Sequence, residues 1–195
     1  MLSPTAPAPQ AHQEPQEPQA AWLKTYYFAR AAFSLAWLLA VQHADAHGAA
    51  AAALLVAYPA WDALANLADA RRSGGLGVNR TQALNVAASV AVAAAIGAAL
   101  PDMHRVLAVF GAWAILSGLL QLGTGLRRWK AFGAQWAMIL SGAQSALAGA
   151  VFILQARAPA EPSAATLAGY AGFGAFYFLV SAVTLSVRDW RRRSA

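Results

Sequence analysis

The chain of 195 residues is 59% hydrophobic and only 11% charged, which excludes an ordinary soluble domain and indicates lipid as its solvent. It contains no cysteine, so disulfides, thiol nucleophiles and iron–sulfur ligation by cysteine are excluded. The net charge of +6 does not indicate a nucleic-acid partner, because the basic residues cluster beside apolar segments, where they set membrane topology and contact anionic lipid.

Six apolar runs each have about the 20 residues that an α-helix needs to cross a bilayer. The sequence therefore predicts an all-α, polytopic membrane protein with six transmembrane helices in three hairpins. Residues 1–21 are rich in proline and glutamine and are expected to form a disordered cytoplasmic tail, and residues 191–195 a basic cytoplasmic end. The membrane domain is expected to cover residues 22–190, with spans at 22–42, 48–70, 81–100, 104–126, 132–156 and 164–187.

The first span has two interpretations. Lys24 and Arg30 precede an apolar stretch that ends in Ala44-Asp45-Ala46, which resembles a secretory signal with its cleavage site. The late start of this span and the aromatic residues near Trp22 instead favour a helix that is retained and anchored at the membrane interface.

The second span carries polar side chains at helical spacing, which form one stripe: Tyr58, Asp62, Asn66 and Asp69. Asp62 lies about 13 Å inward from the double arginine that ends the span, taking 1.5 Å per residue. A carboxylate at that depth costs several kcal/mol unless it is paired, neutralised or wet. Arg30 is expected at a similar depth, and Asn85 enters from the same side. We therefore predict an intramembrane polar cluster of Arg30, Asp62, Asn66 and Asn85.

Three interpretations of this cluster remain open. A structural ion pair would fix how the first three helices pack. A lined cavity or a proton relay would give Asp62 a direct role in function, whereas a shallower position would let the charged side chains snorkel to the interface. Pro59 fits all three, because a proline within a helix frees a backbone carbonyl that polar neighbours can satisfy.

Spans three to six contain an internal repeat. FGAWAILSGLLQL at 110–122 aligns with FGAFYFLVSAVTL at 173–185, and TQALNVAAS at 81–89 aligns with AQWAMILSG at 134–142. Spans three and four thus look like an older copy of spans five and six, and the double arginine after span two permits a third hairpin. Small residues at four-residue spacing in spans three and five favour close packing or self-association into a homo-oligomer over a ligand site.

The basic residues lie almost entirely on one side of the predicted spans. All 14 lysines and arginines except Arg105 and Arg157 fall at the N-terminal flank, the second connection, the fourth connection or the C-terminal end. This positive-inside pattern places both termini in the cytoplasm. We expect a multi-pass protein of the bacterial inner (plasma) membrane whose basic cytoplasmic rim contacts anionic lipid.

The outer side is expected to hold His43, His47 and His104, which form a possible pH-sensing group. The default interpretation is a solvated turn. The string HADAH at 43–47 lacks a defined third ligand, so no metal site is expected. No nucleotide-binding, metalloprotease or nucleophile motif is present, and we expect no cofactor, no catalytic residues and no enzymatic activity.

The segments FGAWAILSGLLQLGTGLRR and WAMILSGAQSALAGAVFIL resemble the HdeD-like acid-resistance membrane proteins, a family of repeated two-helix units with spans of the G-x-x-x-x-x-x-G type. The resemblance is clearest over residues 105–190 and weaker in the first hairpin, which contains Asp62. It implies a membrane fold and survival of acid stress, without established catalytic residues. The expected function is that of a non-enzymatic integral inner-membrane protein of HdeD-like type in acid or envelope stress. A small transporter or channel that uses the Arg30 and Asp62 cluster, and a membrane scaffold or lipid-organising protein, are the alternatives.

Overall fold

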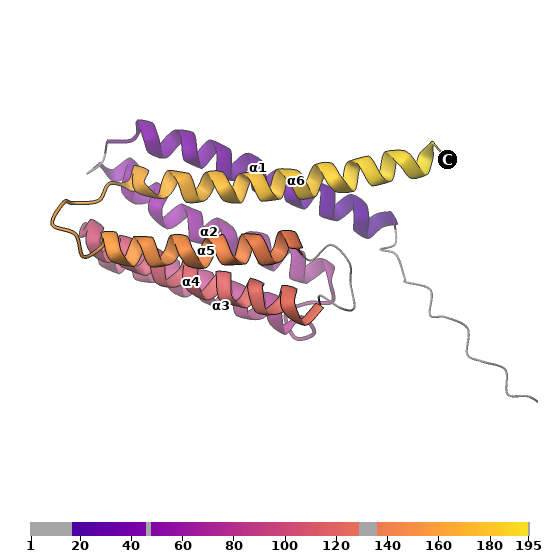
Figure 1. Ribbon diagram of the computed structural model, residues 1–195, viewed down its shortest axis with the longest axis horizontal. Coiled ribbons are helices and arrows are strands. Elements are labelled where there is room, and N and C mark those ends of the chain that lie inside the picture. The colour runs from indigo at the N-terminus through magenta and orange to yellow at the C-terminus, as the bar shows by residue number, and fades with distance from the viewer. Residues whose placement is uncertain (1–16, 46–47, 129–135, 195) are drawn as a thin grey trace, which may run out of the picture.

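The computed structural model describes residues 17–45, 48–128 and 136–194 (Figure 1). Over these residues the regular structure is helical, and the predicted all-α fold with six long helices is confirmed. The helices are α1 (Glu17–His43), α2 (Ala49–Arg72), α3 (Arg80–Ala99), α4 (Met103–Arg128), α5 (Trp136–Gln155) and α6 (Ala168–Arg193), with a short 3-10 helix η1 (Ala164–Leu167) before α6. They run up and down alongside one another as a bundle.

The composition and surface of these helices are those of a multi-pass membrane protein. Among the described residues, 4 helical segments are long and apolar enough to cross a bilayer, and they comprise α2, α3, most of α4, and η1 with α6. α5 adds a shorter apolar segment, Ile139–Gln155. Large apolar side chains point outward, as Leu39 and Leu154 do with exposed fractions of 57% and 68%. Such a surface is stable in lipid and would promote aggregation in water.

Two helix ends extend beyond the predicted spans by five residues or more. α1 begins at Glu17, inside the segment predicted as a tail, whereas residues 1–16 of that tail lie outside the described part. α6 continues through the predicted basic end as far as Arg193. Its 26 residues are about 39 Å long at 1.5 Å per residue, which exceeds a hydrocarbon core of about 30 Å. The last, basic turn can therefore stand in water while the helix remains continuous.

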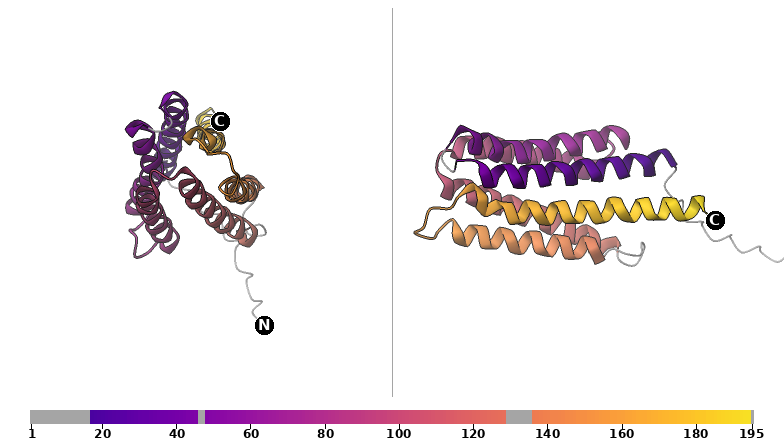
Figure 2. Two further views of the ribbon diagram at one scale, coloured as in Figure 1. Left: turned by 90° about the vertical axis from the view of Figure 1, so that its left-hand side faces the viewer. Right: turned by 90° about the horizontal axis from the view of Figure 1, so that it is seen from above.

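The closest packing is between helices other than the predicted hairpin partners. α4 packs along α5, α2 along α3, and α1 along α6, as the end-on view in Figure 2 also shows. The α1 and α6 pair joins the two ends of the chain through an ion pair between Lys24 and Asp189 and through stacking of the Tyr27 and Phe178 rings. The expected hairpins α1–α2 and α5–α6 are connected in sequence but pack much less extensively.

Glycines explain why α4 and α5 pack so closely. A Cβ atom on Gly111 would lie 2.8 Å from the carbonyl oxygen of Gly149, nearer than real Cβ contacts allow. In lipid, helices associate through close packing rather than through the expulsion of water, and small residues permit that approach. The glycine-bearing faces of α4 and α5 therefore pack against each other.

The two ends of the bundle differ in packing. We call the end with residues 17 and 193 the terminal end, and the end with the α1–α2, α3–α4 and α5–α6 connections the loop end (Figure 1). The largest buried side chains gather in the half nearest the loop end, and they include Leu55, Ile96, Leu107 and Phe110. There the indole nitrogen of Trp37 donates to the Leu54 carbonyl at 2.7 Å, which satisfies its only polar atom. The loop end is therefore sealed by an apolar core.

Candidate functional site

The other half of the bundle contains a partly open cavity, in which polar side chains lie among apolar ones. Its volume is ≈ 680 Å³, and side chains from all six long helices line it, from the middle of the bundle toward the terminal end. Its charged, amide and hydroxyl lining residues are Tyr27, Arg30, Ser34, Tyr58, Asp62, Asn66, Thr81, Asn85, Ser89, Ser117, Gln121, Ser141, Gln144, Ser145, Tyr170, Tyr177 and Ser181. Polar groups in a membrane helix are expensive and normally face the bundle interior or a wet cavity.

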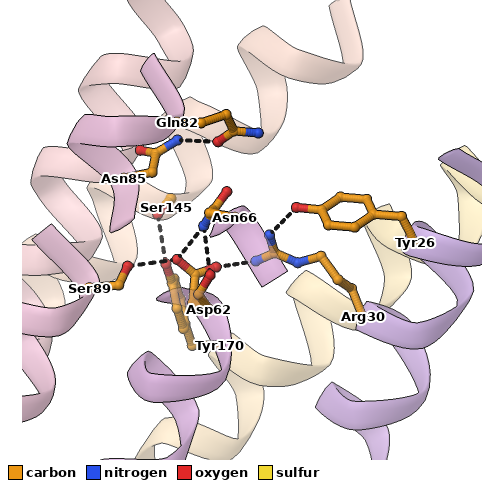
Figure 3. A network of polar contacts seen from close by, with 9 residues as sticks. All are labelled: Tyr26, Arg30, Asp62, Asn66, Gln82, Asn85, Ser89, Ser145 and Tyr170. Atoms are coloured by element: carbon orange, nitrogen blue, oxygen red, sulfur yellow. Dashed lines mark hydrogen bonds and ion pairs between the residues drawn. The ribbon is translucent and has the colours of Figure 1, made fainter. Parts of the chain in front are cut away.

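An ion pair between Arg30 and Asp62 lies at the centre of this site (Figure 3). Both side chains are largely buried, with exposed fractions of 14% and 17%. A second guanidinium nitrogen of Arg30 donates to the Tyr26 hydroxyl at 2.8 Å, and the guanidinium carbon lies 4.3 Å from the centre of the Phe178 ring. Hydrogen bonds and a cation–π contact thus help to offset the desolvation of the arginine.

The Asp62 carboxylate is held by donors from three helices. Besides Arg30 on α1, the Asn66 amide one turn along α2 donates at 2.9 Å, and the Ser89 hydroxyl on α3 donates at 2.7 Å (Figure 3). Asn66 also donates to the backbone carbonyl of Asp62 at 2.8 Å. Each carboxylate oxygen therefore has at least one hydrogen-bond partner.

The structure brings together three of the residues named as a polar cluster, and places the fourth nearby. Arg30, Asp62 and Asn66 are in direct contact. Asn85 also lines the cavity, but its amide donates to the side chain of Gln82 at 3.3 Å, one turn nearer the terminal end. Ser89 occupies the place beside the carboxylate that the sequence analysis assigned to Asn85.

Asp69, the last member of the α2 stripe, is more than an exposed helix end. It accepts hydrogen bonds from the indole of Trp22 at 3.2 Å and from the Gln82 side chain at 2.5 Å, so it links α1, α2 and α3 near the terminal end. The backbone nitrogen of Gln82 in turn donates to the side chain of Asn79 at 3.2 Å, so Asn79 caps the N-terminus of α3.

The polar side chains that α4, α5 and α6 contribute to the site were not predicted from the sequence. The Tyr177 hydroxyl donates to the side-chain carbonyl of Gln144, which joins α6 to α5. Closer to the loop end, the hydroxyls of Ser145 and Tyr170 are 3.0 Å apart, and Ser145 also donates to the Ala114 carbonyl at 2.9 Å. The available signal was a glutamine in the middle of an apolar helix and two tyrosines seven residues apart, which place both hydroxyls on one helix face.

Two buried donors beside the cavity lack a partner within the described ranges. They are the Nε of Arg30 and the indole nitrogen of Trp61. A buried polar group without a partner costs about 1–3 kcal/mol. Both atoms are donors, so a molecule that carries hydrogen-bond acceptors can bind to this wall of the cavity.

The histidines predicted as a pH-sensing group lie at the loop end. His43 is exposed at the C-terminus of α1, and His47 lies outside the described residues. His104, in the first turn of α4, has its Nδ1 atom 3.1 Å from the Ala156 carbonyl. Across residues 17–45, 48–128 and 136–194, no three His, Asp or Glu side chains are arranged to hold a metal ion. The pH-sensing role stays a prediction.

Together, the fold and the site define a polytopic helical membrane protein with a polar cavity inside its bundle. Comparison with family models, with curated proteins and with solved structures gives no match for this chain.

Proposed function

We propose that this chain is a small membrane transporter or channel whose central cavity binds and passes a polar molecule. The observation that supports this proposal is the ≈ 680 Å³ cavity lined by polar side chains from all six long helices. Ligand pockets have volumes of about 300–1,000 Å³ and place a few polar groups among apolar walls. The cavity described above has this size and character.

A purely structural role for the Arg30 and Asp62 pair explains less of the molecule. An ion pair that only holds α1, α2 and α3 together requires its own hydrogen-bond donors, but it does not require polar side chains on the opposite wall of the cavity. That wall carries Gln144, Ser145 and Tyr177, which are far along the chain from the pair and face the same space. Each polar group in a membrane interior has a cost, so a wall that carries several of them fits a binding role.

The sealed loop end determines how a solute would pass. The apolar core around Leu107 and Phe110 closes the bundle on that side of the cavity. Passage therefore requires a second conformation in which this core opens, as in alternating access around a fixed site. With both termini in the cytoplasm, which we propose from the positive-inside pattern, the cavity occupies the cytoplasmic half of the membrane.

The physiological setting that we propose is the bacterial inner membrane during acid or related envelope stress. This rests on the resemblance of residues 105–190 to HdeD-like proteins. The exposed arginines at the terminal end, among them Arg71, Arg72 and Arg188, are suited to anionic lipid at the cytoplasmic face. This lipid contact would anchor the protein, and we propose no enzymatic reaction.

Cysteine accessibility tests the cavity directly, because the chain has no cysteine of its own. In protein reconstituted into liposomes, a water-soluble methanethiosulfonate reagent should modify Ser117→Cys, which lines the cavity. It should leave Leu107→Cys unmodified, since that position is buried in the sealed core with an exposed fraction of 1%. A protected Ser117→Cys, or equal reaction at both positions, would contradict the proposal.

Survival of cells at low pH tests the physiological role. Deletion of the gene should lower survival, and the native chain should restore it. Asp62→Asn should fail to restore survival even when its membrane level matches that of the native protein. Full restoration of survival by Asp62→Asn would show that the Asp62 carboxylate is not required for function.

A further inference from the structure

We propose that the molecule entering the cavity is a single-chain amphiphile with an uncharged polar head, and that it enters from the bilayer between α5 and α6. This inference rests on the proposed function, because it names the ligand of the same cavity. The observation behind it is a shallow apolar groove of ≈ 500 Å³ that runs along the outside of α6 and reaches Gln144 on α5.

The groove exists because α6 packs against α1 rather than against α5. α5 and α6 are consecutive in sequence, yet they pack only sparsely along their length. Gly169 on α6 contributes to the gap, since nothing lies within 4 Å of the position that its Cβ would occupy. Phe173 and Phe176 form the apolar wall, with exposed fractions of 57% and 58%.

The groove and the cavity share their boundary. Gln144, Phe173 and Tyr177 line both of them. The hydrogen bond from the Tyr177 hydroxyl to the Gln144 side chain crosses the gap at this boundary. A polar head that replaces this bond with its own hydrogen bonds can move from the groove into the cavity. The Tyr177 and Gln144 pair therefore acts as a latch on a lateral entrance.

The shape of the groove indicates a chain attached to the head. From Gly169 to Tyr177 the groove follows α6 for about 12 Å at 1.5 Å per residue. This strip is apolar and faces the lipid, so an acyl chain can lie along it while the head is inside. A molecule without an apolar chain cannot enter through this groove, because it does not dissolve in the hydrocarbon of the bilayer.

The charges of the cavity indicate an uncharged head. Arg30 and Asp62 are the charged residues that line it in the part of the chain that the structure describes, and they neutralise each other. A charged head would be buried without a counter-charge, which is strongly unfavourable in a medium of low dielectric constant. The hydroxyl and amide side chains around the pair can instead bind hydroxyl or ester groups, and a monoacylglycerol has this chemistry.

Photocrosslinking of the purified full-length protein in nanodiscs tests the inference. The probe is a monoacylglycerol that carries a diazirine in its acyl chain. Adducts should map to α5 and α6. Gly169→Leu, which fills the groove, should lower their yield by about tenfold, as expected when a groove loses the burial of a few methylene groups. Gly97→Leu is the matched control, since Gly97 on α3 also has nothing within 4 Å of its Cβ position and is exposed.

The outcomes separate the inference from the proposed function. Two results together support lateral entry. The adduct yield falls in Gly169→Leu but not in Gly97→Leu, and unlabelled monoacylglycerol competes with the probe and lowers the yield. An unchanged yield in Gly169→Leu overturns it, and stronger competition by a negatively charged lysophospholipid overturns the uncharged head. Absence of α5 and α6 adducts, in a protein whose Ser117→Cys still reacts with the aqueous reagent, overturns the inference and leaves the proposed cavity function standing. Helicity and elution volume of Gly169→Leu that match those of the native protein exclude misfolding.

Discussion

Gly118 on α4 and Gly142 on α5 meet so closely that a Cβ on Gly118 would lie 2.6 Å from the Gly142 carbonyl oxygen. The reverse substitution is equally restricted, since a Cβ on Gly142 would lie 2.7 Å from the Gly118 oxygen. These backbone contacts recur one heptad away at Gly111 and Gly149. The α4 and α5 pair is therefore a rigid unit that carries one wall of the cavity.

The first prediction follows from this contact. Gly118→Ala should force the two backbones apart and lower the free energy of unfolding by about 1–3 kcal/mol, the usual cost of overpacking. Gly123→Ala on the same helix is the control, because nothing lies within 4 Å of its Cβ position. Thermal unfolding in detergent, followed by far-UV circular dichroism, measures the difference. Equal stability of the two variants would contradict close contact between the α4 and α5 backbones.

The second prediction concerns the Arg30 and Asp62 pair. Removing one partner leaves a buried charge, so Asp62→Asn should lower the free energy of unfolding by about 3–5 kcal/mol. Adding Arg30→Met to this variant removes the unpaired charge and should recover part of the loss. A double-mutant cycle with the two single variants measures the coupling. Strict additivity of the two single effects would show that the groups do not interact energetically.

A swap of the two charges should restore less than this double neutral variant. Ser89 and the Asn66 amide donate to the carboxylate of Asp62. The guanidinium of Asp62→Arg cannot accept a hydrogen bond. The Ser89 hydroxyl can rotate to accept one, but the Asn66 amide also donates to the backbone carbonyl of residue 62, so its N–H groups would still face the guanidinium. The site thus specifies an acceptor on α2, and a swapped pair that regains native stability would contradict this reading of the hydrogen bonds.

The sequence was sufficient to find the ion pair, because depth can be counted along a helix. Arg30 and Asp62 lie at comparable distances from the terminal end, and two opposite charges in lipid have a strong reason to meet. The place of Asn85 could not be counted in the same way. How far α3 is shifted along α2 depends on the turn and on the bond from Gln82 to Asp69, and this shift puts Ser89 beside the carboxylate.

Residues that align in the internal repeat do not have similar surroundings in the folded protein. Phe110 and Phe173 align in the repeat, yet Phe110 is buried with an exposed fraction of 1% and Phe173 is 57% exposed. The reason lies in helix pairing, since α4 packs along α5 whereas α6 packs along α1. The pairing of α6 with α1 determines which face of α6 borders the cavity. Tyr170 and Tyr177 could therefore not be assigned to the site from their spacing alone.

The third prediction concerns the seal at the loop end. Phe110→Ala should open a void in the apolar core and lower the free energy of unfolding by about 3–5 kcal/mol. If the core is the barrier to passage, the variant should also make liposomes leak protons, as reported by an entrapped pH-sensitive dye. Phe28→Ala is the control, because Phe28 is 42% exposed on the outside of α1. A destabilised Phe110→Ala protein that stays proton-tight would assign the barrier to another part of the bundle.

The fourth prediction concerns the latch between α5 and α6. Tyr177→Phe keeps the ring and removes the hydroxyl that donates to Gln144. A hydrogen bond contributes about 0.5–1.5 kcal/mol, so opening should become about twofold to twelvefold easier. A lipid-soluble maleimide should then modify Ser145→Cys, inside the cavity, faster by that factor. Thr184→Val is the control on the same helix, because the hydroxyl of Thr184 bonds the Val180 carbonyl of its own helix. If both substitutions change the rate equally, or if a water-soluble maleimide gains as much as the lipid-soluble one, the latch does not control entry from the bilayer.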